Sequence, residues 1–556
     1  MNDGPLIVQS DQTLLLEVGH PDSEACRNAI AAFAELERSP EHIHTYRITP
    51  LGLWNARASG LLAQQVTESL REWSRFPLPD SLLAQIQDTM NRFGRLTLVN
   101  DERHGLVLIA SDRAVLEEVV RAKAVAPLLG PRIDADTVGV YRGERGRLKQ
   151  ALIKLGWPAE DRAGYVDGTA HEIVSRPGAF DLRPYQSQAV AAFHASGSGV
   201  IVLPCGAGKT LVGIGAMIRT GARTLILVTN TVASRQWRAE LLSRTTLTEN
   251  EIGEYSGERK EMRPVTIATY QIVATRRGNL HAHMELLSAE DWGLVVYDEV
   301  HLLPAPVFRM AADIQSRRRL GLTATLVRED GREGDVFSLI GPKRFDAPWR
   351  DVEAQGWIAP AVCTEVRVTL TDAERMAYAL GEPEERYRLG STALSKLAVV
   401  EALCRGAVAA GEPTLVIGQY LEQLAVLGER LGAPVLTGKT AIRERERLYA
   451  AFRSGELPVL VVSKVANFSI DLPEASVAIQ VSGAFGSRQE EAQRLGRVLR
   501  PKLDGRQAHF YAIVSRDTND QEFALRRQRF LAEQGYSYTI VDAADVLAQA
   551  PRRATD

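Results

Sequence analysis

The sequence predicts an α/β fold with two doubly wound parallel sheets in tandem, preceded by smaller domains that are mainly helical or α+β. The first observation is a change of texture at Phe180, after which short apolar runs alternate with helical segments. The second is that this alternation occurs twice. Such runs are typical of parallel strands that helices cover on both faces. They lie at 199–203, 224–229, 265–269, 294–297 and 320–323, and again at 414–417, 434–436, 459–462, 477–481 and 509–514.

The length of the chain requires several domains. A chain of 556 residues is too long for one hydrophobic core. We expect domains at 1–130, 131–176, 177–350 and 396–556, with a linker at 351–395 between the two α/β units. Hydrophobic residues make up 45% and charged residues 24%, as in an ordinary globular protein. No apolar run reaches the roughly 20 residues that a membrane span needs.

The cysteines and the net charge limit the cellular compartment and the binding partners that can be expected. The four cysteines are scattered and form no CxxC pair, which argues against zinc and disulfides and fits a reducing cytoplasm. The N-terminus lacks the basic flank and long apolar stretch of a signal peptide. The net charge is −3, so composition gives no support for nucleic-acid binding. Any DNA path must therefore be a local basic stripe that acidic surface elsewhere offsets.

The first 130 residues read as amphipathic helices followed by a hairpin. The patterns predict helices at 24–38, 61–76 and 80–93. Two alternating strands, 95–99 and 106–110, follow around a polar turn. Helix, turn, helix and hairpin together resemble a winged helix, which binds either DNA or protein. We favour a protein-docking or packing role, because the presumed recognition helix carries no basic cluster.

A small strand-and-helix unit is predicted at 137–157, after another helix at 112–129. Its basic side chains form either a solvated helix face or a DNA contact. They are Arg142, Arg145, Arg147 and Lys149. The segment 175–178 looks like a linker.

The segment 203–210, Leu-Pro-Cys-Gly-Ala-Gly-Lys-Thr, follows a predicted strand and opens a helix. Small residues let the backbone curl round a triphosphate, so that its N–H groups point at the oxygens. Lys209 would neutralise the β- and γ-phosphates, and the Thr210 hydroxyl would bind Mg²⁺. The segment thus predicts an ATP site formed by Pro204, Cys205, Gly206, Ala207, Gly208, Lys209 and Thr210.

A pair of acids ends the buried strand near 294–297, where ligands sit in open α/β sheets. We expect Asp298 to hold Mg²⁺ through water, and Glu299 to orient and deprotonate the attacking water. His301 would couple the nucleotide site to the neighbouring segment. In isolation two such acids could also be a solvated turn, but the phosphate loop upstream favours the catalytic interpretation.

Two weaker signals flank this site. Thr323 and Thr325 follow the next strand, where small hydroxyl residues could relay the state of the γ-phosphate. Arg183 and Gln186 precede the first strand of the first α/β unit and could read the adenine edge, since an amide offers a donor and an acceptor together. The alternative for the second pair is a plain helix start with Pro at its first position.

Arginines on a helix predicted around 493–500 supply a further element. Arg494, Arg497 and Arg500 recur along one face, beside Gln493, and a guanidinium fork suits phosphate. Alone, this would be an exposed basic helix. The second α/β unit has no phosphate loop of its own, however, which indicates that it lends arginines to the nucleotide of the first unit.

Taken together, these segments resemble the ordered motif series of superfamily 2 helicases, and in particular the XPB branch. The glycine pattern at 203–210 lacks the first Gly of the strict P-loop but fits the shorter helicase variant. The segments that carry the likeness to XPB are 323–330, 339–343, 463–465, 471–475 and 486–500, with a softer likeness at 42–46 and 141–158. The likeness implies two RecA-like domains and a damage-recognition domain before the motor.

The resemblance also implies functional positions. Arg328, Glu329 and Asp330 resemble a motif associated with DNA unwinding, although they could equally form an inter-domain salt bridge. Other segments resemble those that track one DNA strand through its phosphates or couple the domains. These are Thr229, Asn230, Thr269, Tyr270, Ser463, Lys464 and Asp471. The sequence departs from the family at Ser469, where many relatives have Gly, and between 371 and 396, where a full thumb insertion does not fit.

The resulting expectation is a cytoplasmic, nucleoid-associated 3′–5′ DNA helicase that uses ATP and Mg²⁺ on forked or 3′-tailed DNA, in repair. The short thumb region keeps a second reading open, in which a DNA-stimulated ATPase moves on duplex DNA or anchors a repair complex without processive unwinding. A third interpretation is a scaffold protein with an inactive motor, and the intact motif residues argue against it. A nuclease or repair partner bound through the N-terminal domain follows by family analogy alone.

Overall fold

A computed structural model describes most of the chain. The described residues are 3–38, 42–141, 143–179, 181–204, 206–275, 282–315, 317–324, 332–347, 361–463, 475–482, 507–522, 524 and 538–549. Several predicted site residues lie outside these ranges: Arg142, Cys205, Thr325, Arg328, Glu329, Asp330, Lys464, Asp471, Gln493, Arg494, Arg497 and Arg500. Within the described ranges, no helix combines the length and the apolar character needed to cross a bilayer.

The chain begins with an antiparallel sheet that the sequence reading missed. Its strands are ordered β1 (Leu6–Val8), β2 (Thr13–Glu17), β4 (Ile43–Ile48) and β3 (Ala34–Arg38). The helix predicted at 24–38 is wrong in its second half, because α1 covers only Ser23–Ile30. The residues after it alternate between apolar and acidic, and Ala34 and Leu36 are buried while they pair with β4. Period-two burial therefore replaces the helix.

Three helices pack beside this sheet: α2 (Pro50–Ala58), α3 (Ala63–Trp73) and α4 (Asp80–Arg92). The last two confirm the helices predicted at 61–76 and 80–93. Their inward side chains belong to the same apolar core as the sheet, which includes Val66, Leu70, Leu82, Ile86 and Met90.

A second sheet mixes strands from both sides of residue 130. Its order is β7 (Leu129–Arg132), β8 (Thr137–Val140), β6 (Gly105–Ala110), β5 (Leu96–Asp101) and β9 (Ala159–Asp161). The hairpin β5–β6 forms as predicted, but it pairs with β8 and β9 rather than forming a wing on α3 and α4. It packs on α5 (Arg113–Arg121) and α6 (Arg145–Leu155), so the winged-helix grouping is wrong.

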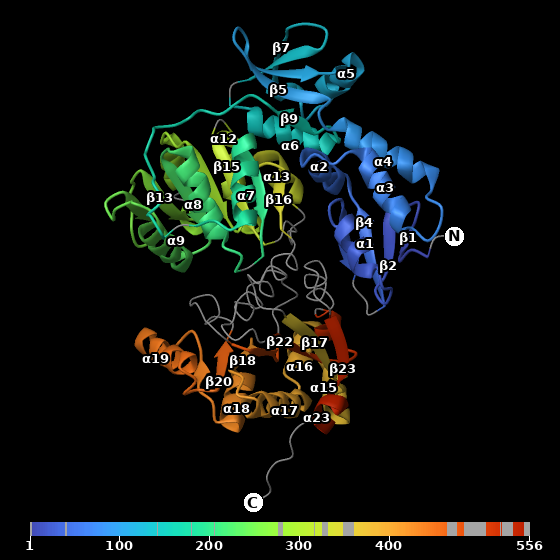
Figure 1. Cartoon of the computed structure of the whole chain (residues 1–556), viewed down its shortest axis with the longest axis vertical. Helices are drawn as coiled ribbons and strands as arrows, with labels where there is room; N and C mark the ends of the chain where they lie inside the picture. The colour runs from blue at the N-terminus through green and yellow to red at the C-terminus, as the bar shows by residue number, and fades with distance from the viewer. Residues whose placement is uncertain are drawn as a thin grey trace, which may run out of the picture.

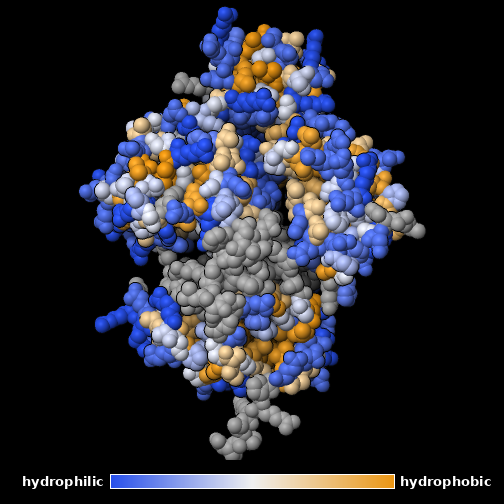
Figure 2. All heavy atoms as spheres, in the orientation of Figure 1, coloured by the Kyte–Doolittle hydropathy of each residue, from blue (hydrophilic) through white to orange (hydrophobic). Residues whose placement is uncertain are grey.

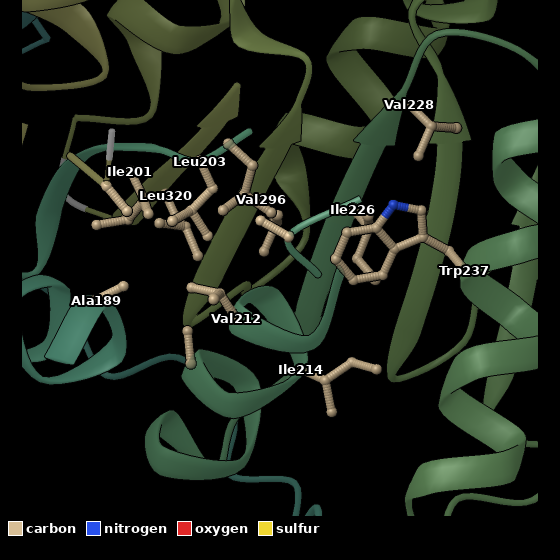
Figure 3. Packing of buried hydrophobic residues seen from close by; sticks show 14 of the residues in the cluster. Ala189, Ile201, Leu203, Val212, Ile214, Ile226, Val228, Trp237, Val296 and Leu320 are labelled. Carbon is tan, nitrogen blue, oxygen red and sulfur yellow. The ribbon is translucent and has the colours of Figure 1, made fainter. Parts of the chain in front are cut away.

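The first motor domain is a seven-stranded parallel sheet. Its order is β12 (Ile252–Tyr255), β13 (Val265–Thr269), β11 (Thr224–Val228), β14 (Leu294–Asp298), β15 (Arg318–Thr323), β10 (Ser198–Val202) and β16 (Lys343–Asp346). Five of these strands were predicted, and the two edge strands, β12 and β16, were not. The buried strands pack on α8 (Lys209–Thr220) and α9 (Thr231–Arg244), with Val212 and Trp237 in the core shown in Figure 3.

The remaining helices of this domain surround the same sheet. They are α7 (Pro184–Ser196), α10 (Tyr270–Ala274), α11 (Ala282–Ala289), α12 (Ala305–Asp313) and α13 (Glu333–Leu339), with a 3-10 turn, η2 (Val300–Leu302).

The second motor domain repeats the architecture in a separate lobe (Figure 1). Its order is β19 (Val435–Leu436), β20 (Val459–Ser463), β18 (Thr414–Gly418), β21 (Val477–Gln480), β22 (Ala508–Ser515), β17 (Ala361–Val368) and β23 (Tyr538–Asp542). Its helices are α15 (Asp372–Leu380), α16 (Pro383–Ser391), α17 (Ser395–Ala409), α18 (Leu421–Leu431), α19 (Ile442–Arg453) and α23 (Ala543–Gln549). The segment read as a linker thus contributes β17, α15 and α16.

The connection into the motor is a docked strap, residues 166–176, rather than a free linker. The N–H of Arg223 donates to the carbonyl of Thr169, and the N–H of Arg176 donates to the carbonyl of Arg244. Gly168 lies so close to Gly293 that a Cβ would come within 2.3 Å of its nitrogen. Figure 1 shows this teal segment running around the first motor domain before it enters α7. On the face shown in Figure 2, hydrophilic residues predominate over the part of the surface that is coloured by hydropathy.

Candidate nucleotide site

The phosphate loop joins β10 to α8. Gly206 and Gly208 both adopt the left-handed conformation, with φ of 83° and 80°. A Cβ on Gly208 would come within 2.4 Å of the Gln186 Nε2, so this glycine is needed for space as well as for its backbone angles. Because α8 begins at Lys209, its first N–H groups open onto the loop. Such a helix N-terminus attracts phosphate.

Gln186 and Tyr185 brace the loop from behind. The Gln186 Nε2 donates to the carbonyl of Ala207 at 2.8 Å, and the Tyr185 hydroxyl donates to the same oxygen at 2.8 Å. The Gln186 Oε1 accepts from the N–H of Arg183 at 2.9 Å, and the whole side chain is buried. The amide therefore connects α7 to the loop. Adenine recognition by Gln186 and Arg183 stays a prediction.

The strand ends bring together side chains that lie far apart in the sequence. The Lys209 Nζ lies 3.3 Å from the Glu299 Oε1, and the Glu299 Oε2 lies 3.5 Å from the His301 Nδ1. The same imidazole nitrogen is 2.7 Å from the Thr323 hydroxyl. Glu299 has φ of 51°, a strained conformation for a residue with a side chain, and such strain concentrates at functional sites. Four predicted residues thus form one continuous chain of contacts.

The two acids differ in their electrostatics. Burial and the neighbouring Glu299 carboxylate raise the pKa of Asp298 to about 6, although the Trp237 indole and Lys209 oppose this shift. Burial would also raise the pKa of Glu299, but the attraction of Lys209 and His301 holds it below its usual value. Glu299 is therefore the first of the pair to ionise.

Two hydrogen bonds to Asp298 were not foreseen. The Trp237 Nε1 donates to the Asp298 Oδ2 at 2.9 Å, and the Tyr270 hydroxyl donates to the Asp298 main-chain carbonyl at 2.6 Å. Trp237 had no signal beyond being one aromatic residue in an otherwise largely polar helix. Tyr270 was predicted as part of a DNA-tracking segment. Both side chains are buried, so neither offers an open surface to DNA.

The other predicted tracking residues sit at helix starts. The Asn230 Oδ1 accepts from the N–H of Ala233 in the first turn of α9, and the Asn230 Nδ2 donates to the Thr229 hydroxyl at 3.3 Å. The Thr269 hydroxyl caps α10 by accepting from the N–H of Ile272. In the second motor domain, Ser463 ends β20 and is buried.

Two of the four basic side chains that were read as either a solvated face or a DNA contact are buried, and Arg142 lies outside the described residues. Arg145 and Lys149 are buried and share the carboxylate of Asp161, at 2.6 Å and 2.9 Å. Lys149 also donates to the Gln315 Oε1 at 2.8 Å, which joins this unit to the first motor domain. Arg147 remains exposed, paired with Glu144. The spacing of charges on a helix did not reveal which of its faces was buried.

The side chains at the site fit a magnesium ion that is held jointly by the protein and the phosphates of a nucleotide. Among the described residues, no group of three or more His, Cys, Asp or Glu side chains is arranged to hold a metal ion. Asp298 and the half-buried Thr210 instead offer two oxygen donors beside the phosphate loop. Mg²⁺ in nucleotide sites is commonly held by one or two protein ligands together with the phosphates.

Comparisons with known proteins decide the family. The model for the ERCC3/RAD25/XPB C-terminal helicase matches residues 352–554, and one for the type III restriction enzyme res subunit matches 179–328. A helicase conserved C-terminal domain model matches 6–134. The chain is 69% identical to the DNA 3′-5′ helicase XPB of Kineococcus radiotolerans, over 98% of both chains. The chain belongs to the XPB family of superfamily 2 helicases.

Other XPB proteins are similarly close. The DNA 3′-5′ helicase XPB of Mycobacterium tuberculosis is 66% identical over 99% of this chain and all of its own length. Membership of the XPB family makes the chain an enzyme of the helicase and ATPase class. Among solved structures, the helicase domain of Pyrococcus furiosus Hef aligns at 15% identity with a TM-score of 0.45, covering 62% of this chain and 97% of that domain.

Proposed function

We propose that this XPB protein is a 3′–5′ DNA helicase that couples ATP hydrolysis, between its two motor domains, to the opening or remodelling of DNA during repair. The contact chain from Lys209 through Glu299 and His301 to Thr323 supports this most strongly. It links the phosphate loop, which follows β10, to the end of β15, the neighbouring strand in the sheet. The family and the names of the curated relatives supply the nucleic acid and the polarity.

The roles of the side chains follow from their placement. Lys209, now facing Glu299, would turn to the phosphates when ATP binds. Lys209 and His301 keep Glu299 ionised before that point. Once Lys209 has turned away, the pKa of the carboxyl would rise, and Glu299 would be free to orient the attacking water and accept its proton. Asp298 and Thr210 would hold Mg²⁺, which supplies charge neutralisation to the phosphates. Arg497 and Arg500, supported by Gln493, are proposed from the sequence to reach the same nucleotide from the second domain.

DNA would signal to this site through the segments that precede α9 and α10. The hydrogen bond from Tyr270 to the carbonyl of Asp298 gives the segment that begins at Thr269 a direct link to the acids. Ser463, Lys464 and Asp471 are proposed to act similarly from the second motor domain. Arg328, Glu329 and Asp330 are proposed to take part in strand separation.

A translocase that moves on duplex DNA without separating its strands is the second candidate. The observation that favours it is the short segment between β17 and α17, which holds only α15 and α16 among its described elements. A full thumb insertion does not fit there, and strand separation is less well supported without one.

Two assays on the intact protein separate these functions. Strand displacement on a 3′-tailed duplex tests unwinding, and displacement of a third strand from a triplex tests movement alone. We expect both activities, and both should disappear in Lys209→Ala but not in Lys154→Ala, an exposed lysine on α6. Triplex displacement without duplex separation would establish the translocase instead. Full ATP turnover in Lys209→Ala would refute the nucleotide site itself.

A further inference from the structure

Asp298 is held at both its side chain and its main chain by aromatic residues from two different helices. The indole N–H of Trp237, on α9, donates to the Oδ2 at 2.9 Å. The hydroxyl of Tyr270, the first residue of α10, donates to the carbonyl oxygen at 2.6 Å. In the sheet β11 lies next to β14, and β13 lies on the far side of β11. The helix after β11 is α9 and the helix after β13 is α10. Both helices thus contact the end of β14.

The fold makes specific room for the indole. Trp237 is 1% exposed, and a Cβ added at Gly213 of α8 would come within 2.4 Å of its Cη2 atom. Figure 3 shows the ring packed among core side chains, with its nitrogen on the side of Val228, the last residue of β11. The ring is therefore locked by packing, and its single donor points in one fixed direction.

A comparison within the same domain shows that this arrangement is not required for burial. Trp292 is also fully buried, and its Nε1 donates at 2.6 Å to the main-chain carbonyl of Leu287. A carbonyl is sufficient to satisfy a buried indole. Trp237 instead donates to one oxygen, the Oδ2, of the carboxylate proposed to hold Mg²⁺.

We propose that Trp237 and Tyr270 are positioning residues for Asp298, which fix the carboxylate in the orientation that binds Mg²⁺ with ATP. This rests on the proposed role of Asp298 as a holder of that ion. Partners that orient the ligands of a metal typically change its affinity by about 10- to 100-fold when they are removed. The hydrogen bond to the main chain acts on the same residue, since it fixes the turn in which Glu299 adopts its left-handed conformation.

The test measures how Mg²⁺ strengthens the binding of a fluorescent ATP analogue to the full-length protein. Trp237→Phe keeps most of the ring and removes the donor. We expect it to need about 10- to 100-fold more Mg²⁺ for the half-maximal effect, with analogue binding in EDTA unchanged. Trp292→Phe removes an equally buried donor that does not touch Asp298, and should match the wild type. Equal Mg²⁺ midpoints in the two variants would overturn the proposal.

Tyr270→Phe provides a second variant that deletes only one hydroxyl, with Tyr255→Phe as its control. Tyr255 is equally buried, and its hydroxyl contacts His283 instead. We expect a higher Mg²⁺ midpoint in Tyr270→Phe alone, and ATP turnover restored by excess Mg²⁺. If Trp237→Phe does not fold, an unchanged midpoint in Tyr270→Phe overturns the proposal. Wild-type protein that binds the analogue with Mg²⁺ but shows no DNA-stimulated turnover would refute the proposed function and leave this inference intact.

Discussion

Lys209 and Glu299 face each other at 3.3 Å across the ends of β10 and β14, with the lysine from the phosphate loop and the glutamate from the strained turn after β14. Lys209 is the strongest attractive partner of the Glu299 carboxylate. Binding of phosphate would draw the lysine away, and the carboxylate would then be free to act on water. Under the proposed function, the pair would keep Glu299 from acting as a base until the phosphates of ATP engage Lys209.

Replacing Glu299 with Gln should separate binding from chemistry. The amide can still accept a hydrogen bond from Lys209 but cannot take a proton from water, so we expect ATP turnover to fall by about 10²- to 10⁴-fold. Affinity for ATP should be unchanged or higher, because Lys209 no longer has a charged competitor. Steady-state turnover and binding of a fluorescent ATP analogue measure the two effects. A Glu299→Gln protein that keeps more than a tenth of wild-type turnover would exclude Glu299 as the base.

The buried charge of Asp298 should cost stability at neutral pH. Its pKa is raised to about 6 from an ordinary value near 4, so the folded protein carries a penalty that develops as the pH rises from about 4 to about 6 and is fully present above that. Asp298→Asn should therefore be more stable than the wild type by about 1–3 kcal/mol at pH 7.5, while losing ATP turnover. The gain should vanish near pH 4.

Thermal unfolding of the two proteins across this pH range measures the difference. Glu299→Gln is the comparison, because it relieves Asp298 of a neighbouring charge but also removes a carboxylate that Lys209 and His301 attract. We therefore expect a smaller gain in Glu299→Gln than in Asp298→Asn. A lower melting temperature for Asp298→Asn at pH 7.5 would contradict the expected burial penalty. The same titration predicts that kcat/KM for ATP, which reports the free enzyme, falls as the pH drops through about 6, where Asp298 becomes protonated.

The sequence predicted those parts of the fold and site that depend on local patterns. Buried parallel strands are recognisable as apolar runs. Asp298 and Glu299 lie at the end of one such run, and Lys209 begins the helix after the loop that follows another. β3 was misread because a helix and a strand can both begin from the same amphipathic segment, and only its pairing with β4 decides. Trp237 was missed because nothing local distinguishes an indole that packs from one that also bonds a carboxylate.

The buried ions on α6 illustrate the same limit. Arg145 and Lys149 look like solvated or DNA-binding charges until Asp161 is brought beside them by the pairing of β9 with β5. That pairing joins segments far apart in the chain, so no helical periodicity reveals it.

Asp161 should be the most sensitive residue of this cluster. Burial disfavours its charge, but Lys149 and Arg145 hold the pKa of the carboxyl well below its usual range, so its contribution is present above the ordinary pKa of Asp and is lost as the pH falls. Asp161→Asn leaves two buried cations without their counter-ion. We expect the unit formed by β5 to β9 to lose about 3–5 kcal/mol in urea unfolding at neutral pH.

The neighbouring pair of Glu160 and Arg162 serves as the matched control, because Arg162 is largely exposed. Glu160→Gln should change the free energy of unfolding by less than about 1 kcal/mol. Equal effects of the two substitutions would mean that burial does not set the strength of the Asp161 cluster.

Gly146 should be the point at which α6 is fastened to the motor. A Cβ at this position would come within 2.5 Å of the carbonyl oxygen of Ala312 and 2.6 Å of its Cα, and main-chain atoms cannot turn aside as a side chain can. We expect Gly146→Ala to separate α6 from α12 and to cost about 1–3 kcal/mol. Hydrogen exchange should rise in both helices.

Gly406→Ala on α17 is the control, because nothing lies within 4 Å of the added Cβ. It should stabilise its helix by up to about 1 kcal/mol. Unchanged exchange in α12 of Gly146→Ala would show that the close approach does not hold the two units together.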